Sequence, residues 1–432
     1  MATDAGRGVQ SPAPERERFH REHSGRAELP YLVFGELYIV LALIVSFGVV
    51  EAATTPLWLA VSALGVGVAL IAPLGAISRV FVSVPLILFL VWTGVSIAWS
   101  ADPTTFRHEL LQVVPIAFAT ILVSSLLPIS RIVRSVKVAT LGGLALTIGS
   151  MIVHPSTTTV ANLPEDEGTQ LGWHGLFDHK NGMMAFVALA VVTFIALEER
   201  RWLKYTVVVT SFVLALGAQS STGMSVLIGV CIAAVWLNSY LRQSSRFTSA
   251  FMTLSVFGGI ALIGLLTMLL PAFVNLYGKD LTFNGRTEIW SASIDSIKER
   301  PVLGYGLDGV WKDPSLEPTS TMLRQIGFRA WHAHSSVLEL LLELGVVGLV
   351  LYLSWFASVF VAGWRALQTA PTLGKWVLLF CVMQIVMSLS EVMVFGGWLV
   401  CLILLRAVLA RSAAPLEPLP PDAVGRRSIV AR

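Results

Sequence analysis

The feature that most constrains this chain is a series of apolar runs of roughly 20 residues that recur along most of its length. A helix of that length crosses the hydrocarbon core of a bilayer. Inside lipid every backbone polar group must be satisfied within its own segment, which favours helices. Only 13% of the 432 residues are charged and 55% are hydrophobic, so the chain lacks the polar surface of a soluble globule. The sequence therefore predicts an all-α, polytopic membrane protein.

Twelve transmembrane spans are expected. They lie near 31–50, 57–74, 80–99, 109–127, 132–152, 182–197, 203–218, 223–240, 250–271, 335–362, 376–391 and 394–410. These spans divide the chain into a tail (1–30), nine spans (31–271), one large loop (272–334), three spans (335–410) and a second tail (411–432). Both tails are polar or rich in proline and alanine, and are expected to be disordered.

The distribution of lysine and arginine predicts the orientation. On the twelve-span arrangement, 21 of the 30 basic residues fall on the side of the N-terminus, and seven of the other nine lie in the single long loop. Basic residues in short loops favour the cytoplasm, whereas long loops cross the membrane largely regardless of charge. The sequence therefore predicts a bacterial inner-membrane protein with both termini in the cytoplasm and the 272–334 loop in the periplasm.

The long loop is expected to contain short helices. Trp290, Ile294 and Ile297 recur at helical spacing and predict an amphipathic helix that lies on the membrane surface. Asn284 is the expected N-cap of this helix, and Pro301 is expected to end it.

Histidines and cations gather at the outer mouths of two expected spans. Arg329, His332 and His334 lead into the tenth span, and His179 and Lys180 lead into the sixth. Arginine and lysine suit phosphate groups, and histidine can take a proton from a sugar hydroxyl near neutral pH. This pattern favours a lipid-carried, phosphate-containing substrate.

Each of these residues also has a purely structural interpretation. His179 and His332 fit equally well as surface residues, Arg286 as a contact to lipid phosphate, and Lys180 as an interfacial anchor. Glu343, one turn after another acid near the outer end of a span, fits either a functional role or helix packing.

Neither a metal nor a cofactor is expected. All three cysteines lie inside apolar runs, and the Cys/His spacing typical of zinc sites is missing. Nucleic acid is not an expected partner.

Two groups of motifs resemble a known family. The order Gly285-Arg286, Trp290, Pro301-Val302-Leu303-Gly304-Tyr305-Gly306, His334-Ser335-Ser336-Val337-Leu338 and Glu343-Leu344-Gly345 resembles the O-antigen ligase and polymerase superfamily. The blocks Gly175-Leu176-Phe177-Asp178-His179-Lys180-Asn181-Gly182 and Trp99-Ser100-Ala101-Asp102-Pro103 are similar to its exopolysaccharide-polymerase branch.

The resemblance implies a metal-independent glycosyl transfer on the periplasmic face, with a polyprenyl-diphosphate-linked oligosaccharide as the donor. The family's essential loop histidine falls on His334, which would act as the base. Its loop arginine falls on Arg286, which would bind the diphosphate leaving group. Lys180, Arg329, His332, His179 and Glu343 are the expected substrate-binding residues. Membrane lipids and a chain-length regulator or flippase are the further partners expected.

The chain departs from the family pattern at two positions. Ser335 stands where an asparagine commonly follows the loop histidine, and Ser221 lies in a turn where the family often carries arginine or lysine. If the second cation is needed, Lys180 or Arg329 must supply it.

Three functions are compatible with these features. The leading hypothesis is a polymerase that joins lipid-linked repeat units into a surface or exopolysaccharide. A ligase that transfers the finished glycan to a lipid-A core or a protein would use the same chemistry. A transporter or flippase would place ionisable residues at mid-membrane and usually show repeat symmetry. Here the cations and histidines concentrate at one face and one loop dominates, which favours an enzyme.

Overall fold

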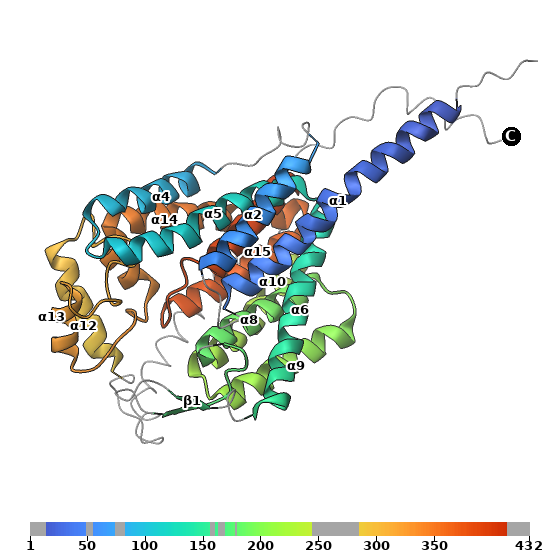
Figure 1. Cartoon of the computed structure of the whole chain (residues 1–432). Coiled ribbons are helices and arrows are strands. Elements are labelled where there is room, and N and C mark those ends of the chain that lie inside the picture. The colour runs from blue at the N-terminus through green and yellow to red at the C-terminus, as the bar shows by residue number, and fades with distance from the viewer. Residues whose placement is uncertain are drawn as a thin grey trace, which may run out of the picture.

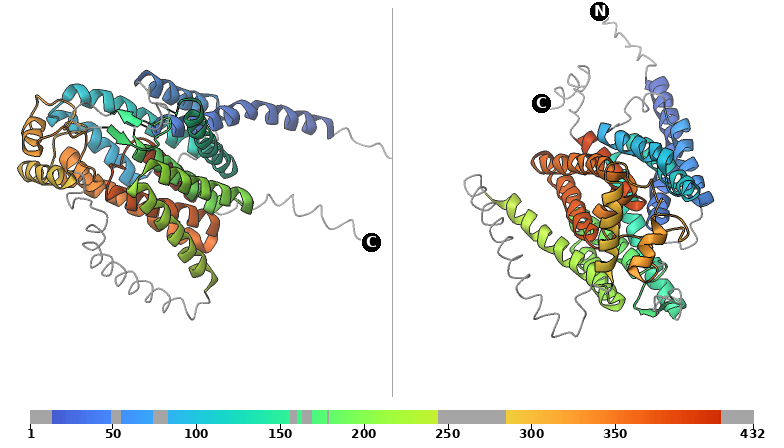
Figure 2. Two further views of the ribbon diagram at one scale, coloured as in Figure 1. Left: turned by 90° about the horizontal axis from the view of Figure 1, so that it is seen from below. Right: turned by 90° about the vertical axis from the view of Figure 1, so that its left-hand side faces the viewer.

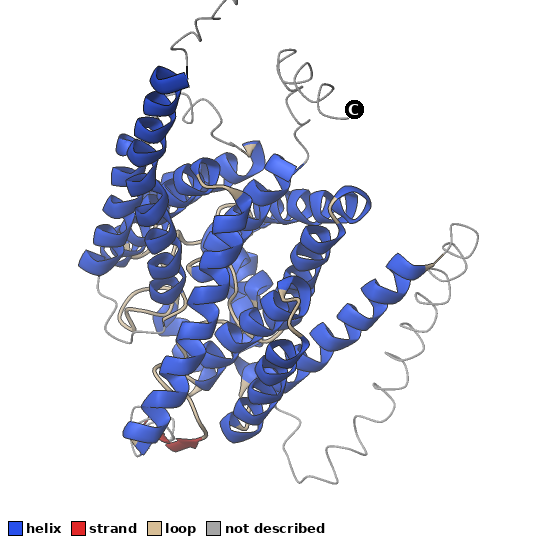
Figure 3. Cartoon of the chain, turned by 90° about the vertical axis from the view of Figure 1, so that its right-hand side faces the viewer, coloured by secondary structure: helices blue, strands red, loops and turns tan. Residues whose placement is uncertain are grey.

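Helices make up nearly all of the structure (Figure 1). A computed structural model describes residues 14–48, 55–73, 83–155, 160–162, 169–177, 179–243 and 285–412. Within these residues the only strands are β1 (Val160–Asn162) and β2 (Thr169–Leu171), which pair antiparallel (Figure 3). The expected helical class is confirmed, with this short hairpin as an addition.

Among the described residues, six helices are long and apolar enough to cross a membrane, judged by length and composition. They are α5 (Pro103–Leu126), α6 (Ile129–Val153), α8 (Lys180–Leu197), α10 (Ser221–Arg242), α14 (Ser336–Thr369) and α15 (Pro371–Ser388). Three shorter apolar stretches also occur. The first is Pro30–Ser46 in α1 (Pro14–Ser46), and the second is α2 (Thr55–Ile71). The third is Val84–Trp99, where α4 (Val84–Val95) continues into the 3₁₀ turn η1 (Ser96–Trp99). Two further helices, α9 (Arg201–Ala218) and α16 (Gly397–Ser412), complete this set.

The protein is therefore a multi-helix membrane protein, although twelve spans are not confirmed. Each expected span but one coincides with a helix among the described residues. The exception, near 250–271, lies outside them.

The centre of the bundle is formed by α8, α15 and α16. α15 contacts α8, α10 and α14, and α16 contacts α1, α5 and α14. Nearly every residue of α8 and α16 with a described side chain is buried or partly buried. By contrast, α9 and α10 expose apolar side chains such as Leu216 and Val235. Exposed apolar faces of this kind suit contact with lipid.

α14 is interrupted at Gly345, whose backbone has φ 64° and ψ −170°. The interruption frees carbonyl groups of the preceding turn, and other segments donate to them. The backbone N–H of Tyr305 donates to Leu342 at 2.7 Å, that of Gly306 donates to Glu343 at 2.7 Å, and the Trp92 indole donates to Leu344 at 3.0 Å. Irregular backbone within an apolar helix is tolerated when protein groups satisfy it in this way.

The segment 285–335 forms a cap at the end of the bundle away from the start of α1 (Figures 1 and 2). It contains α12 (Arg286–Glu299) and α13 (Thr319–Ile326), which pack on each other. The expected helix and its end before Pro301 are confirmed, whereas its expected cap, Asn284, lies outside the described residues.

The buried face of α12 differs from the expected one. Ile289, Ala292, Ser293 and Ser296 are buried, whereas Ile294 is exposed. The helix packs against α13 and α14. Its buried face is therefore turned by about one residue from the stripe that the largest apolar side chains suggested.

Candidate active site

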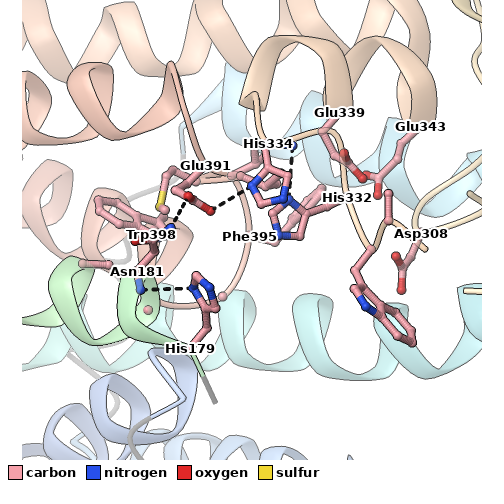
Figure 4. A pocket seen from close by; sticks show the side chains of 18 of the residues that line it. His179, Asn181, Asp308, His332, His334, Glu339, Glu343, Glu391, Phe395 and Trp398 are labelled. Atoms are coloured by element: carbon pink, nitrogen blue, oxygen red, sulfur yellow. Dashed lines mark hydrogen bonds and ion pairs between the residues drawn. The ribbon is translucent and has the colours of Figure 1, made fainter. Parts of the chain in front are cut away.

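A cavity of about 1220 Å³ opens between the 285–335 cap and the bundle. Its walls come from α5, α8, α14, the cap and the turn that joins α15 to α16. Figure 4 shows its labelled side chains in an order that runs from His179 and Asn181, through Glu391 and the two histidines His332 and His334, to a group of carboxylates. The cavity thus has chemically different ends.

Glu391, only 5% exposed, is the centre of the first group. One carboxylate oxygen accepts a hydrogen bond from Asn181 Nδ2 at 2.5 Å and lies 3.0 Å from Arg286 Nη2. The other oxygen lies 3.5 Å from Nδ1 of His334. One acid therefore joins α8, the start of α12 and His334, two residues before α14. We call Arg286, His332, His334 and Glu391 the histidine end of the cavity.

Ser336 holds the turn that carries Glu391 against the start of α14. Its hydroxyl donates to the backbone oxygen of Glu391 at 3.0 Å and accepts from the backbone N–H of Met393 at 2.8 Å. Ser335, which replaces the family's asparagine, is the N-cap residue of α14 and makes no side-chain capping bond. The serine that follows it therefore supplies the polar link at this position.

The two histidines of the cap lie together. Their ring centroids are 4.0 Å apart, and the backbone N–H of His334 donates to Nδ1 of His332 at 3.2 Å. His334 has a φ of 48°, a left-handed backbone that is uncommon outside glycine and is often found at functional sites. Trp290 secures the segment by donating its indole N–H to Ala333 at 3.0 Å.

The electrostatics of the histidine end keep Glu391 charged and His332 neutral. Burial acts to raise the pKa of Glu391, but the hydrogen bond and charge of His334, with the charges of His332 and Arg286, lower it. Burial, reinforced by the charge of His334, lowers the pKa of His332 to about 3. At neutral pH the pair Arg286–Glu391 is therefore ionised beside an uncharged imidazole.

The segment before α8 contributes His179 and Asn181 to the cavity. His179 is the N-cap of α8 and accepts from the Asn181 backbone N–H at 3.2 Å. Burial lowers the pKa of His179. Ser220, in the turn where the family often carries a cation, donates to Asn181 Oδ1 at 2.8 Å and caps α10. The turn that carries Ser220 is thus connected to Glu391 through the side-chain amide of Asn181.

Lys180 and Arg329 are placed differently. Arg329 lines the cavity, where its guanidinium donates to the backbone oxygens of Trp311 and Lys312 at 2.8 and 2.9 Å and stacks 4.3 Å from the centre of the Trp331 ring. Lys180 is the first residue of α8, next to His179, and is outside the set of residues that line the cavity. Of these two residues, the structure brings Arg329 to the site.

The other end of the cavity is lined by Glu109, Asp308, Glu339 and Glu343 together with Lys312, and we call it the carboxylate end. Asp308 lies 3.6 Å from the Lys312 ammonium. Burial raises the pKa of Asp308 to about 7 against the opposing charge of Lys312. The charges of Asp308 and Glu109 raise the pKa of Lys312 although burial acts to lower it. Lys312 therefore stays protonated.

One group of side chains has the spacing of a metal site. Ligand atoms of His332, His334 and Glu391 lie within 4.8 Å of one another. Arg286 places a positive charge 3.0 Å from the same carboxylate, which opposes the binding of a cation there.

Sequence reasoning identified most of the histidine end but missed its centre. His334, His332, His179 and Glu343, all expected from the motifs, line one cavity. Arg286 is not one of the lining residues, but it contacts Glu391, which is. Glu391 was not among the residues expected to form the site. Asn181 belonged to a motif but had no assigned role, and Asp308 and Lys312 were not singled out. No local pattern marks Asn181 and Glu391, because their partners are distant in the sequence.

Comparison with known proteins finds one matching family and one curated relative. Residues 206–353 match the family described as O-antigen ligase, a range that includes Arg286, His334 and Glu343. The chain is also 33% identical over 146 residues to the exopolysaccharide production protein ExoQ of Rhizobium meliloti (strain 1021). That similarity covers 32% of this chain and 32% of the relative. Together these matches confirm the resemblance of this membrane protein to the O-antigen ligase superfamily and its exopolysaccharide branch.

Proposed function

We propose that the protein is a metal-independent membrane glycosyltransferase that polymerises polyprenyl-diphosphate-linked oligosaccharide repeat units. The observation that carries the proposal is the meeting of Arg286 and His334 on the two oxygens of one buried carboxylate, Glu391, at the wall of a large cavity. A cation for the leaving group and a base for the incoming hydroxyl thereby lie next to each other.

Arg286 would bind the diphosphate of the donor. Its guanidinium carries further N–H groups besides the one that faces Glu391, and arginine forms forked hydrogen bonds with phosphate. The starts of α8, α12 and α14 gather at this end of the cavity, and helix N-termini favour anions. Arg329, already at the cavity wall, would supply the second cation, in preference to Lys180.

His334 would act as the general base. With Nδ1 turned to Glu391, a proton on Nδ1 leaves Nε2 with a lone pair for the acceptor hydroxyl. That hydroxyl loses its proton to Nε2 as its oxygen bonds to the anomeric carbon. The bond from this carbon to the diphosphate breaks, and the electron pair leaves on the diphosphate oxygen, where Arg286 stabilises the charge. His179 and His332 would line the path of the sugar.

The same proposal sets the location of the protein. Both termini would be cytoplasmic, twelve spans would cross the bacterial inner membrane, and the 285–335 cap would face the periplasm, where lipid-linked repeat units accumulate. The positions of the basic residues and the placement of the cap away from the start of α1 support this orientation. A chain-length regulator or a flippase would be the natural protein partner.

Reconstitution tests the function directly. Purified protein in proteoliposomes, given one lipid-linked oligosaccharide extracted from cells that lack the protein, should produce a ladder of longer lipid-linked chains, and should do so in the presence of EDTA. His334→Ala and Arg286→Ala should each abolish the ladder while protein level and membrane insertion stay normal. Ladders of normal length from either variant would remove that residue from the mechanism.

A ligase is the second candidate because the matching family is described as O-antigen ligase. A ligase would leave a single lipid-linked oligosaccharide unchanged until a distinct acceptor, such as lipid-A core, is added. The same reconstitution therefore separates the two functions.

A further inference from the structure

The carboxylate end of the cavity has no role in the donor chemistry described above. Glu339 and Glu343 lie one turn apart on α14 and are 4% and 6% exposed. Asp308 comes from the cap and Glu109 from α5, and all four side chains line the same cavity. Ionisable residues in an apolar helix are costly, so a group of four in one place indicates a function.

The contacts within this group leave one carboxylate facing the cavity. Glu339 accepts a 2.6 Å hydrogen bond from the backbone N–H of Ala333, which ties it to the segment that carries His334. Asp308 is paired with Lys312. Among the described residues, the Glu343 carboxyl accepts from the backbone N–H of Asp308 and lies next to the carboxyl of Glu339. Its remaining hydrogen-bonding capacity points into the cavity beside Glu339 (Figure 4).

This end of the cavity is a poor site for the diphosphate. Its cation, Lys312, is already paired with Asp308 at 3.6 Å, whereas Arg286 lies beside Glu391 at the histidine end. Carboxylates accept hydrogen bonds from hydroxyl groups, and the Lys312 ammonium can donate to a hydroxyl or ring oxygen. These are the groups that an uncharged sugar ring presents.

The size and order of the cavity also suit two substrates. Its volume of about 1220 Å³ exceeds that of most single-ligand pockets, roughly 300–1,000 Å³. The two histidines lie between Glu391 and the carboxylates (Figure 4). A base at His334 would therefore face a donor on one side and an acceptor on the other.

We propose that the carboxylate end is the acceptor subsite, in which Glu343, Asp308 and Lys312 bind the hydroxyl groups of an uncharged sugar and present one of them to His334. This inference rests on the proposed glycosyl transfer and adds to it the class of acceptor.

The test separates acceptor binding from donor binding. Wild-type protein, Glu343→Gln and Asp308→Asn are reconstituted with the lipid-linked donor at fixed concentration and with a varied octyl glycoside of the repeat oligosaccharide as acceptor. The acceptor KM should rise about tenfold to a hundredfold in each variant, because each one alters a buried hydrogen-bonding group that the acceptor contacts. The Kd of radiolabelled polyprenyl diphosphate should change by less than about twofold, since these residues do not contact it.

Two controls make the result specific. Asp295→Asn removes an exposed carboxylate of α12 that pairs with Lys298 outside the cavity, and its acceptor KM should equal that of the wild type. A series of monodeoxy acceptors should include one that the wild type and Glu343→Gln use equally well, because the hydroxyl that binds Glu343 is then missing. A residue needed only for folding would not erase that difference.

The outcomes distinguish this inference from the function on which it rests. If the wild type transfers sugar but the variants keep the wild-type acceptor KM, or weaken donor binding as much as acceptor use, the acceptor subsite is wrong and the function stands. If the wild type transfers sugar neither to the octyl glycoside nor to a lipid-linked oligosaccharide, the acceptor subsite and the proposed function are both wrong. Should Glu343→Gln not fold, Asp308→Asn decides, because asparagine tolerates the left-handed backbone of that position.

Discussion

The Nη2 atom of Arg286 lies 3.0 Å from Oε1 of Glu391, although 105 residues separate them in the chain. The pair is partly shielded, with side-chain exposures of 20% and 7%, so solvent weakens it less than a surface ion pair. Because the other oxygen of Glu391 faces His334, this one carboxylate sets the positions of both residues assigned to the reaction.

Replacing Glu391 by glutamine should therefore lower the rate of sugar transfer by roughly 10- to 100-fold. The amide keeps the shape of the side chain and can still bind Asn181, but it loses the charge that orients Arg286 and His334. Initial rates of ladder formation in proteoliposomes measure the effect. Glu317→Gln, an exposed acid that pairs with Arg324, is the control. A wild-type rate for Glu391→Gln would show that the carboxylate charge is dispensable.

Replacing Arg286 by lysine should leave measurable but reduced activity, about a tenth of the wild-type rate or less. Lysine keeps the positive charge, but its ammonium cannot bind Glu391 and a phosphate in the forked geometry of a guanidinium. The measurement is the rate at saturating acceptor together with the Kd of polyprenyl diphosphate. Arg324→Lys on the exposed face of α13 serves as the matched variant. Full activity from Arg286→Lys would show that only the positive charge is needed at this position and that the forked hydrogen bonding of the guanidinium is not.

Replacing Gly345 by alanine should destabilise the protein by about 1–3 kcal/mol or more. A Cβ there would lie 2.1 Å from the backbone oxygen of Val302, and the residue has a positive φ that other residues rarely adopt. Thermal unfolding in detergent gives the comparison. Gly149→Ala on α6, where a Cβ meets nothing within 4 Å, should be neutral or slightly stabilising. Equal unfolding temperatures for the two variants would contradict the close packing at Gly345.

Acid should destabilise the protein partly through His332. Burial lowers the pKa of His332 from 6.5 to about 3, so below about pH 6.5 the unfolded chain binds a proton that the folded protein does not. This contribution to stability is present above pH 6.5 and decreases as the pH falls toward 3. The unfolding temperature should fall less between pH 7 and pH 5 in His332→Gln than in the wild type. His108→Gln, at an exposed position, should keep the wild-type slope; identical slopes for all three proteins would remove His332 as the cause.

Much of the fold followed from local patterns in the sequence. Apolar runs located the helices because their length and composition are local properties, and Pro301 marked the end of α12. The face of α12 was misjudged because the large side chains Trp290 and Ile294 dominated the pattern. In the structure Ile289 and two serines face α13 and α14, where small side chains permit close packing. The periodicity of a helix does not show which other helices it packs against.

The interruption of α14 at Gly345 was also not predicted from the sequence. Apolar residues flank Gly345 on both sides, and a glycine in such a run is tolerated in an ordinary helix. Only the contacts with Pro301 and Tyr305, about 40 residues earlier, show that the backbone must depart from helical geometry there. The motifs Pro301–Gly306 and Glu343–Gly345, which lie on either side of His334 in the sequence, therefore contact each other in the structure.

For the candidate site, sequence patterns identified the residues with reactive side chains, but not the residues that connect them. His334 and Arg286 stand in recognisable motifs, whereas Glu391 is a single acid in a turn, and nothing near it indicates that Asn181 and Arg286 will contact it. Long-range pairing of this kind requires the fold.

The interruption of α14 also limits how this protein can be re-engineered or can diverge. Donors from residues 305 and 306 and from α4 occupy three successive carbonyls of a membrane helix. A cap transplanted from a relative would leave the carbonyls of Leu342 and Glu343 without donors unless its backbone met them in the same register. Swaps designed to change sugar specificity should therefore exchange the cap and the first turns of α14 as one unit.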